Sequence, residues 1–230
     1  MSEYFSSSLY FGLLLSLLAY HLAARLKQRF KLAIFNPVMV SIILVMAFLL
    51  IFNIDFEHYN SSAQYLSYLL TPTTVCLAVP LYQQMEKLKK YSYAILGGIL
   101  AGVVTNLCLI LALSTLFHLS HETYVTLLPK SITSAIAIPL CEEYGGIVAI
   151  MLAAITLTGL LGNVIAESVC RWFKITEPVA KGIAIGTSSH GTGTAKAIEL
   201  GEVEGAMSSL AIAVAGIMTV IIAPFFVGLY

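Results

Sequence analysis

Six stretches of the chain are long, apolar and free of Asp, Glu, Lys and Arg. Crossing a hydrocarbon core about 30 Å thick takes roughly 20 apolar residues, and each stretch reaches that length. A soluble protein could not cover so much apolar surface. The sequence therefore predicts an all-α integral membrane protein with six crossing helices. The stretches are Tyr4–Ala24, Leu32–Ile54, Tyr59–Met85, Tyr91–Phe117, Tyr144–Ala166 and Gly205–Tyr230.

Composition narrows the function classes further. Only 10% of the 230 residues are charged and the formal net charge is zero, so no basic face indicates a nucleic-acid partner. The four cysteines lack CxxC spacing, which is typical of free thiols, and the sequence gives no metal or cofactor site. We expect no enzyme activity, because spacing places no acid–base or nucleophile–base pair. The N-terminus lacks a basic region and a cleavage site, so Tyr4–Ala24 is expected to be retained.

Basic residues between the predicted spans indicate their orientation. Short loops rich in Lys and Arg stay cytoplasmic, and segments 25–31 and 87–90 are such loops. The N-terminus is then outside the cytoplasmic membrane. Arg171, Lys174 and Lys181 fit the same rule only if Tyr144–Ala166 runs from outside to inside.

This orientation predicts two segments that enter the membrane without crossing it. Residues 123–143 would enter from outside, and residues 178–202 would dip in from the cytoplasm and return. The first contains two prolines and a lysine, and its longest uncharged apolar piece, Ser131–Cys141, is half a membrane thick. In the alternative both segments cross fully, which gives eight spans and puts Arg171 outside.

Both segments carry polar groups where lipid tolerates few. Backbone that leaves helical geometry at membrane depth persists only inside protein or beside a watery cavity. Pro129 predicts a helix start in the first segment. In the second, four glycines give freedom to unwind and five hydroxyls could meet a ligand. They are Gly182, Gly186, Gly191 and Gly193, with Thr187, Ser188, Ser189, Thr192 and Thr194.

A small anion would account for this set of residues. Free N–H groups at the N-termini of half-helices bind carboxylates, and a lysine completes charge neutralisation. His190 suits proton coupling, and the spans contain no Asp cluster typical of Na⁺ sites. The candidate binding residues are Lys130, Ser131, Thr133, Ser134, Thr187, Ser188, His190, Thr192, Gly193, Thr194 and Lys196.

Each of these residues also has a purely structural interpretation. Glycines in membrane helices allow close packing, and hydroxyls bond to the preceding turn. Lys196 could snorkel to the cytoplasm and Lys130 could anchor at the interface. Glu167 and Arg171, spaced i,i+4, are expected to pair at a helix end.

A short internal similarity suggests an inverted repeat within one polytopic domain, 1–230. Ala-Val-Pro-Leu at 78–81 precedes Gly-Gly-Ile at 97–99, and Ala-Ile-Pro-Leu at 137–140 precedes Gly-Gly-Ile at 145–147. The implied halves are about 32–117 and 123–230. Inverted repeats are common in secondary transporters, whose sites lie near midplane between broken helices.

The sequence resembles the LrgB/CidB family over nearly its whole length. The motifs that carry the resemblance are PKSITSAIAIPLCEEYGGIVA at 129–149 and VAKGIAIGTSSHGTGTAKAIELGEVEGAMSSLA at 179–211, with Asn36-Pro37 and Pro80-Leu81-Tyr82 earlier. The chain departs from the family pattern at Ser134, Ala135, Gly191 and Thr192.

The resemblance implies a bacterial inner-membrane protein, close to the enterobacterial YohK-like branch. It implies transport of small monocarboxylates of the pyruvate, lactate, glycolate or glycerate type. The alternative is a holin- or antiholin-like role in controlling murein hydrolases and lysis. Family members work beside a small membrane partner of the LrgA/CidA type, and the length of the chain also suits a homo-oligomer.

Overall fold

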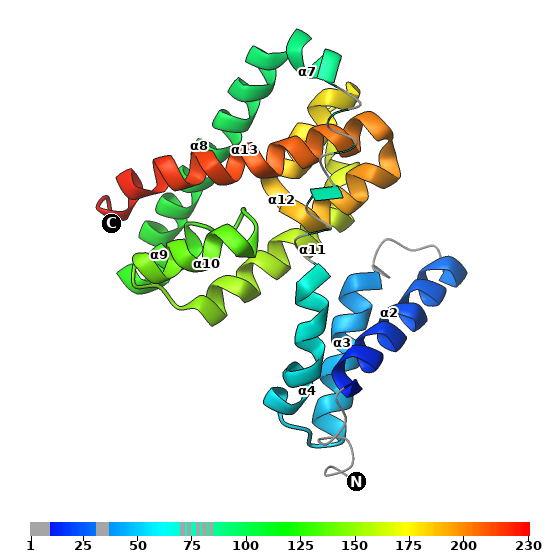
Figure 1. Cartoon of the computed structure of the whole chain (residues 1–230). Helices are drawn as coiled ribbons and strands as arrows, with labels where there is room; N and C mark the ends of the chain where they lie inside the picture. The colour runs from blue at the N-terminus through cyan, green and yellow to red at the C-terminus, as the bar shows by residue number, and fades with distance from the viewer. Residues whose placement is uncertain are drawn as a thin grey trace. The chain divides into compact units, whose positions relative to one another are not determined.

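The computed structural model describes residues 10–30, 37–69 and 85–230, with residues 72, 75, 76, 79 and 82 described singly between the last two ranges. Within these residues all regular structure is helical and no strand occurs. The chain forms two compact units, Met1–Cys76 and Leu77–Tyr230 (Figure 1). The prediction of an all-α protein is confirmed.

The first unit is a small helical cluster. The backbone N–H of Gly12 donates to Ser62 Oγ at 2.6 Å, and a Cβ at Gly12 would overlap the Tyr59 carbonyl, so the two helices concerned approach closely. Two helix ends differ here from the predicted spans. The first helix continues beyond Ala24, where the first predicted span ends, and the third helix begins at Phe56, three residues before the third predicted span. Its helices are α2 (Phe11–Phe30), α3 (Pro37–Ile51), α4 (Phe56–Ala63) and the 3₁₀ helix η1 (Gln64–Leu69).

Parts of the predicted first three spans lie outside the described residues. These parts are positions 4–9, 32–36 and most of 70–84, which include Asn36, Pro80 and Leu81. The predicted repeat halves depend on these positions and remain a prediction.

The second unit contains three helices long and apolar enough to cross a membrane: α8, α11 and α13. They confirm three of the predicted spans, and α11 extends six residues past Ala166 to Trp172. The helices of this unit are α7 (Met85–Lys90), α8 (Ser92–Phe117), α9 (His121–Leu127), α10 (Ser134–Glu143), α11 (Val148–Trp172), α12 (Pro178–Leu200) and α13 (Glu202–Val227).

The short helices α9 and α10 form a hairpin that returns to the end of the unit where α8 finishes. Just before α11, the N–H of Ile147 donates to Thr126 Oγ1 in α9 at 2.8 Å. Tyr124 Oη donates to the carbonyl of Phe226 at 2.7 Å, and Tyr230 Oη donates to the carbonyl of Leu119. The chain therefore enters α11 beside the point where it left α8, and we name this the Leu119 end.

Helix α12 is also a hairpin, because it reverses at His190. This residue has φ 40° and ψ −140°, which is not helical. A Cβ at Gly193 would lie 3.1 Å from Cγ2 of Ile185, eight residues earlier. In a straight helix those positions would be about 12 Å apart. The second half therefore folds back on the first, as the predicted re-entrant segment requires, and its entry from the cytoplasm stays a prediction.

The two hairpins enter the second unit from opposite ends. Tyr91 at the start of α8 and Glu177 at the start of α12 line one pocket, so both lie at the end opposite Leu119. Helix α11 runs away from the Leu119 end, and α13 runs toward it. Each hairpin is thus followed by a long helix of opposite direction, which favours six crossings with two re-entrant segments over eight spans.

Candidate functional site

A cavity of about 760 Å³ lies between α8, α11 and α12 and reaches the turn between α9 and α10. We call it the central cavity. Both hairpins contribute to its wall, so the two segments singled out in the sequence face one space. Its polar lining residues are Thr105, Asn106, Lys130, Ser131, Thr158, Thr187, Ser188 and Ser189.

The tip of the α9–α10 hairpin supplies a lysine to this cavity. Lys130 Nζ donates to Asn106 Oδ1 at 3.0 Å and to Ser131 Oγ at 3.2 Å. Ser131 Oγ in turn donates to Asn106 Oδ1 at 3.0 Å. Asn106 lies near the middle of α8, so the group sits deep along that helix.

The charge of Lys130 has no acidic partner among the described residues. The ion pairs formed there join Arg171, Glu167, Lys196 and Glu199, and none includes Lys130. A half-buried cation bound only by neutral groups is costly in a low-dielectric site and favours a negatively charged ligand. The central cavity is therefore electrostatically suited to an anion.

The first half of α12 supplies further hydroxyls to the cavity lining. Ser188 Oγ donates to the Ala184 carbonyl at 2.7 Å and lies 3.1 Å from Ser189 Oγ. Thr187 is 8% exposed, and its Oγ1 has no hydrogen-bond partner among the described residues. A buried hydroxyl without a partner is unfavourable, so Thr187 can gain a hydrogen bond from a ligand or water.

The tip of α12 is fixed to its neighbours by polar contacts. His190 Nε2 lies 3.0 Å from the Ile155 carbonyl of α11, and Asn163 Nδ2 donates to the Thr192 carbonyl at 2.7 Å. Thr194 Oγ1 donates to the His190 carbonyl at 3.0 Å and lies 2.7 Å from Ser208 Oγ of α13. These contacts stabilise the reversed backbone.

Two glycines of α11 leave room for that tip. A Cβ at Gly159 would lie 2.7 Å from His190 Cε1, and one at Gly162 would overlap the Ser189 side chain. Close approach of this kind is the common use of glycine between membrane helices.

The structure brings four of the predicted binding residues into the central cavity and leaves the others outside it. Lys130, Ser131, Thr187 and Ser188 line the cavity. The remaining predicted residues support the hairpins or lie elsewhere: Thr133, Ser134, His190, Thr192, Gly193, Thr194 and Lys196. His190, which was expected to suit proton coupling, contacts α11 through its Nε2.

Lys196 is engaged in ion pairs outside the cavity. Its Nζ lies 3.5 Å from Glu167 Oε2 and 3.5 Å from Glu199 Oε2. Glu167 also pairs with Arg171 at 3.1 Å, which confirms the predicted i,i+4 contact. Two carboxylates thus balance the charge of Lys196 already.

Two local expectations are wrong. Pro129 does not start a helix, because α10 begins at Ser134 with Thr133 as its N-cap. Gly182 and Gly186 do not unwind α12: a Cβ at either would overlap the backbone of α13, so both serve close packing. The reversal falls on His190, between the glycines.

Sequence reasoning missed several lining residues on α8 and α11. Asn106 and Thr105 lie in α8, Thr158 and Gly162 in α11. Asn106 could have been found from the sequence, because it is a lone amide in an apolar span. Polar residues inside membrane helices are typically functional.

Comparison with known proteins places the chain among bacterial membrane proteins. Residues 16–229 match the LrgB-like family. The chain belongs to the LrgB family. Antiholin-like protein LrgB of Bacillus cereus (strain B4264) is 37% identical over 218 residues, which cover 94% of this chain and 95% of the relative. Antiholin-like protein LrgB of Bacillus anthracis (strain CDC 684 / NRRL 3495) shows the same identity and coverage.

No solved structure matches the chain. As an LrgB-family protein with three membrane-length helices in its second unit, it is a multi-pass bacterial membrane protein. The central cavity lies in the region that matches the family, as do both hairpins.

Proposed function

We propose that this LrgB-family protein transports small monocarboxylates and binds them in the central cavity. The observation that carries the proposal is Lys130, a half-buried cation with no acidic partner among the described residues. A carboxylate would supply the missing negative charge. Its second oxygen could accept from Asn106 Nδ2, which donates to no described residue.

The hydroxyls of α12 suit the remainder of a small acid. Thr187, Ser188 and Ser189 can donate to an oxo group or accept from a hydroxyl. Because the two hairpins enter from opposite ends, the site lies where a substrate could be released to either side. Broken helices that meet near midplane are the arrangement on which alternating access operates.

Coupling and partners are further parts of the proposal. Proton coupling is one such part, because a carboxylate that crosses together with a proton moves no net charge across the membrane. A small LrgA/CidA-like membrane protein is the expected partner in the membrane.

A second candidate function rests on the names of the relatives, which are called antiholin-like. In that case the protein would have a holin- or antiholin-like role in regulating murein hydrolases and lysis, and a holin-like role would make the membrane leaky to solutes of many kinds. Selective carboxylate flux and unselective leakage are separable in one assay.

The test is uptake into proteoliposomes of radiolabelled two- to four-carbon monocarboxylates, with and without the small partner. Lys130→Met should lower uptake about tenfold or more, since a charged hydrogen bond to a ligand contributes about 2–3 kcal/mol. Lys196→Met is the matched control and should transport within about twofold of wild type, because its charge is balanced by Glu167 and Glu199. Dye leakage without carboxylate selectivity would instead favour a holin-like role.

A further inference from the structure

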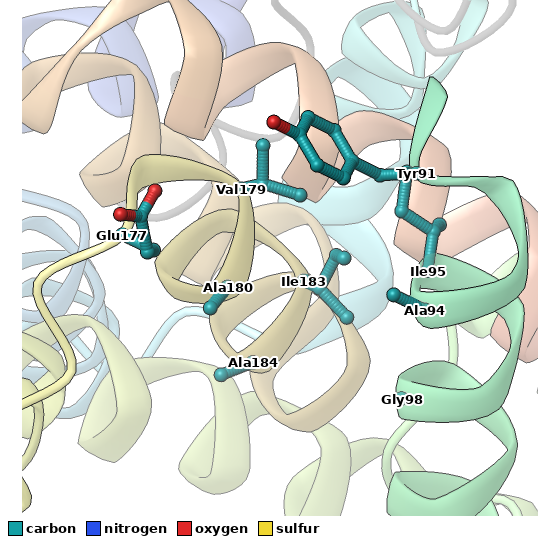
Figure 2. Close-up of a pocket in the computed structure, with 9 residues that line it drawn as sticks. All are labelled: Tyr91, Ala94, Ile95, Gly98, Glu177, Val179, Ala180, Ile183 and Ala184. Atoms are coloured by element: carbon teal, nitrogen blue, oxygen red, sulfur yellow. The ribbon is translucent and has the colours of Figure 1, made fainter. Parts of the chain in front are cut away.

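A second pocket, of about 550 Å³, opens where α8 and α12 begin. Figure 2 shows Tyr91 and Glu177 toward one end of this pocket and Gly98 and Ala184 toward the other. We call it the entry pocket. The aliphatic residues Ile95, Val179 and Ile183 form its walls.

The entry pocket and the central cavity share part of their lining. Gly98, Ile183 and Ala184 belong to both, so the two spaces adjoin at these residues. Along α8, the distance from Tyr91 to Asn106 is about 22 Å at 1.5 Å per residue. The combined space thus extends from one end of the unit to the Lys130 group.

We infer that the entry pocket is the route by which the carboxylate reaches the central cavity, and that Gly98 keeps this route open. The inference rests on the proposed function and adds to it the access path and the residue that limits its width. Gly98 marks the junction because a side chain there would point at α12. A Cβ at Gly98 would lie 3.7 Å from Cγ2 of Ile183, an ordinary contact, so a longer side chain would occupy the shared space.

Basic residues outnumber acidic ones around the entry pocket, although the carboxylate of Glu177 lines the pocket itself. Lys90 Nζ lies 5.3 Å above the ring of Tyr91, which lines the entry. Several basic residues flank the two helix starts, and clustered positive charge raises the local concentration of anions. They are Lys89, Lys90, Lys174 and Lys181. The same residues orient this end toward the cytoplasm.

Two neighbouring glycines give a matched test. Gly98→Leu fills the junction, whereas a Cβ at Gly97 meets no atom within 4 Å, so Gly97→Leu leaves it open. In proteoliposomes containing the full chain, Gly98→Leu should lower initial lactate uptake about tenfold, and Gly97→Leu should stay within about twofold of wild type. Equal uptake by wild type and Gly98→Leu would overturn the route.

A second measurement separates blockage from misfolding. Gly98→Cys, in a background with the four native cysteines replaced by alanine, is reconstituted first and then treated with a bulky thiol reagent. Uptake should fall only after treatment, and the background without Gly98→Cys should keep its uptake when it is treated in the same way. Unchanged uptake after complete labelling would contradict the route.

The two proposals fail differently. If wild type takes up no carboxylate, the proposed function fails and the route with it. If wild type transports and Lys130→Met does not, but filling the junction has no effect, only the route is wrong.

Discussion

Lys130 Nζ donates to Asn106 Oδ1 over 3.0 Å, which fixes the amide of Asn106 with its oxygen toward the lysine. Because Oδ1 also accepts from Ser131 Oγ, the Nδ2 group is left as a donor with no described partner. A lysine and an amide N–H₂ thus lie side by side in the central cavity, both able to donate to one carboxylate.

The variant Asn106→Asp tests this relationship. Aspartate has nearly the shape of asparagine but brings a negative charge next to Lys130, so the pair becomes self-neutralised and repels a carboxylate. The KM for carboxylate uptake should rise about tenfold or more while the protein remains folded. Initial rates over a range of substrate concentrations measure this, and a KM within about twofold of wild type would contradict the assigned site.

Thr187 and Thr194 should respond oppositely to loss of a hydroxyl. Thr187→Val removes a buried oxygen that has no described partner, so the free energy of unfolding should stay equal or rise slightly while uptake falls. Thr194→Val removes an oxygen bonded to the His190 carbonyl and close to Ser208 Oγ, and should destabilise by about 1–3 kcal/mol. Thermal unfolding in detergent compares them, and equal destabilisation would disprove the distinction.

The backbone of His190 predicts an order of stability between two variants. Both His190→Gly and His190→Ala lose the contact of Nε2 with the Ile155 carbonyl. Only glycine adopts φ 40° without strain, so His190→Gly should be about 1 kcal/mol more stable than His190→Ala. If alanine is the more stable, the hairpin does not reverse at this residue.

The glycines of α11 and α8 predict opposite effects of one methyl group. At Gly162 a Cβ would overlap Ser189, so Gly162→Ala should destabilise by about 1–3 kcal/mol or displace the α12 tip. At Gly97 the Cβ meets nothing, and Gly97→Ala should stabilise the helix by up to about 1 kcal/mol. Equal effects in chemical unfolding would show that α11 and the α12 tip are not in close contact.

Hydropathy and charge predicted much of the architecture. The length of the apolar stretches predicted α8, α11 and α13. The rule that basic residues stay cytoplasmic, applied to Arg171, predicted that both polar segments return to the side from which they enter. These are global constraints, set by membrane thickness and by the distribution of lysine and arginine. They do not depend on which residue makes which contact.

The details of the site depend on contacts that sequence spacing does not encode. Asn106 and Lys130 are 24 residues apart in the chain. They meet only because the α9–α10 hairpin packs against α8. The reversal of α12 falls on His190, although its glycine neighbours have the greater intrinsic freedom. Contacts with Ile155, Asn163 and Ser208 on other helices stabilise the reversal at His190. Backbone propensity, which favours the glycines, therefore predicted the wrong residue for it.

The most direct test of the account is whether one carboxylate protects both hairpins from a thiol reagent. Ser131→Cys on the first hairpin and Ser188→Cys on the second are introduced singly, with the four native cysteines replaced by alanine. Thr156→Cys, on α11 outside the cavity lining, is the control. Lactate or glycolate should slow labelling at 131 and at 188 and leave 156 unchanged. Protection of only one hairpin, or of neither, would contradict a shared binding cavity.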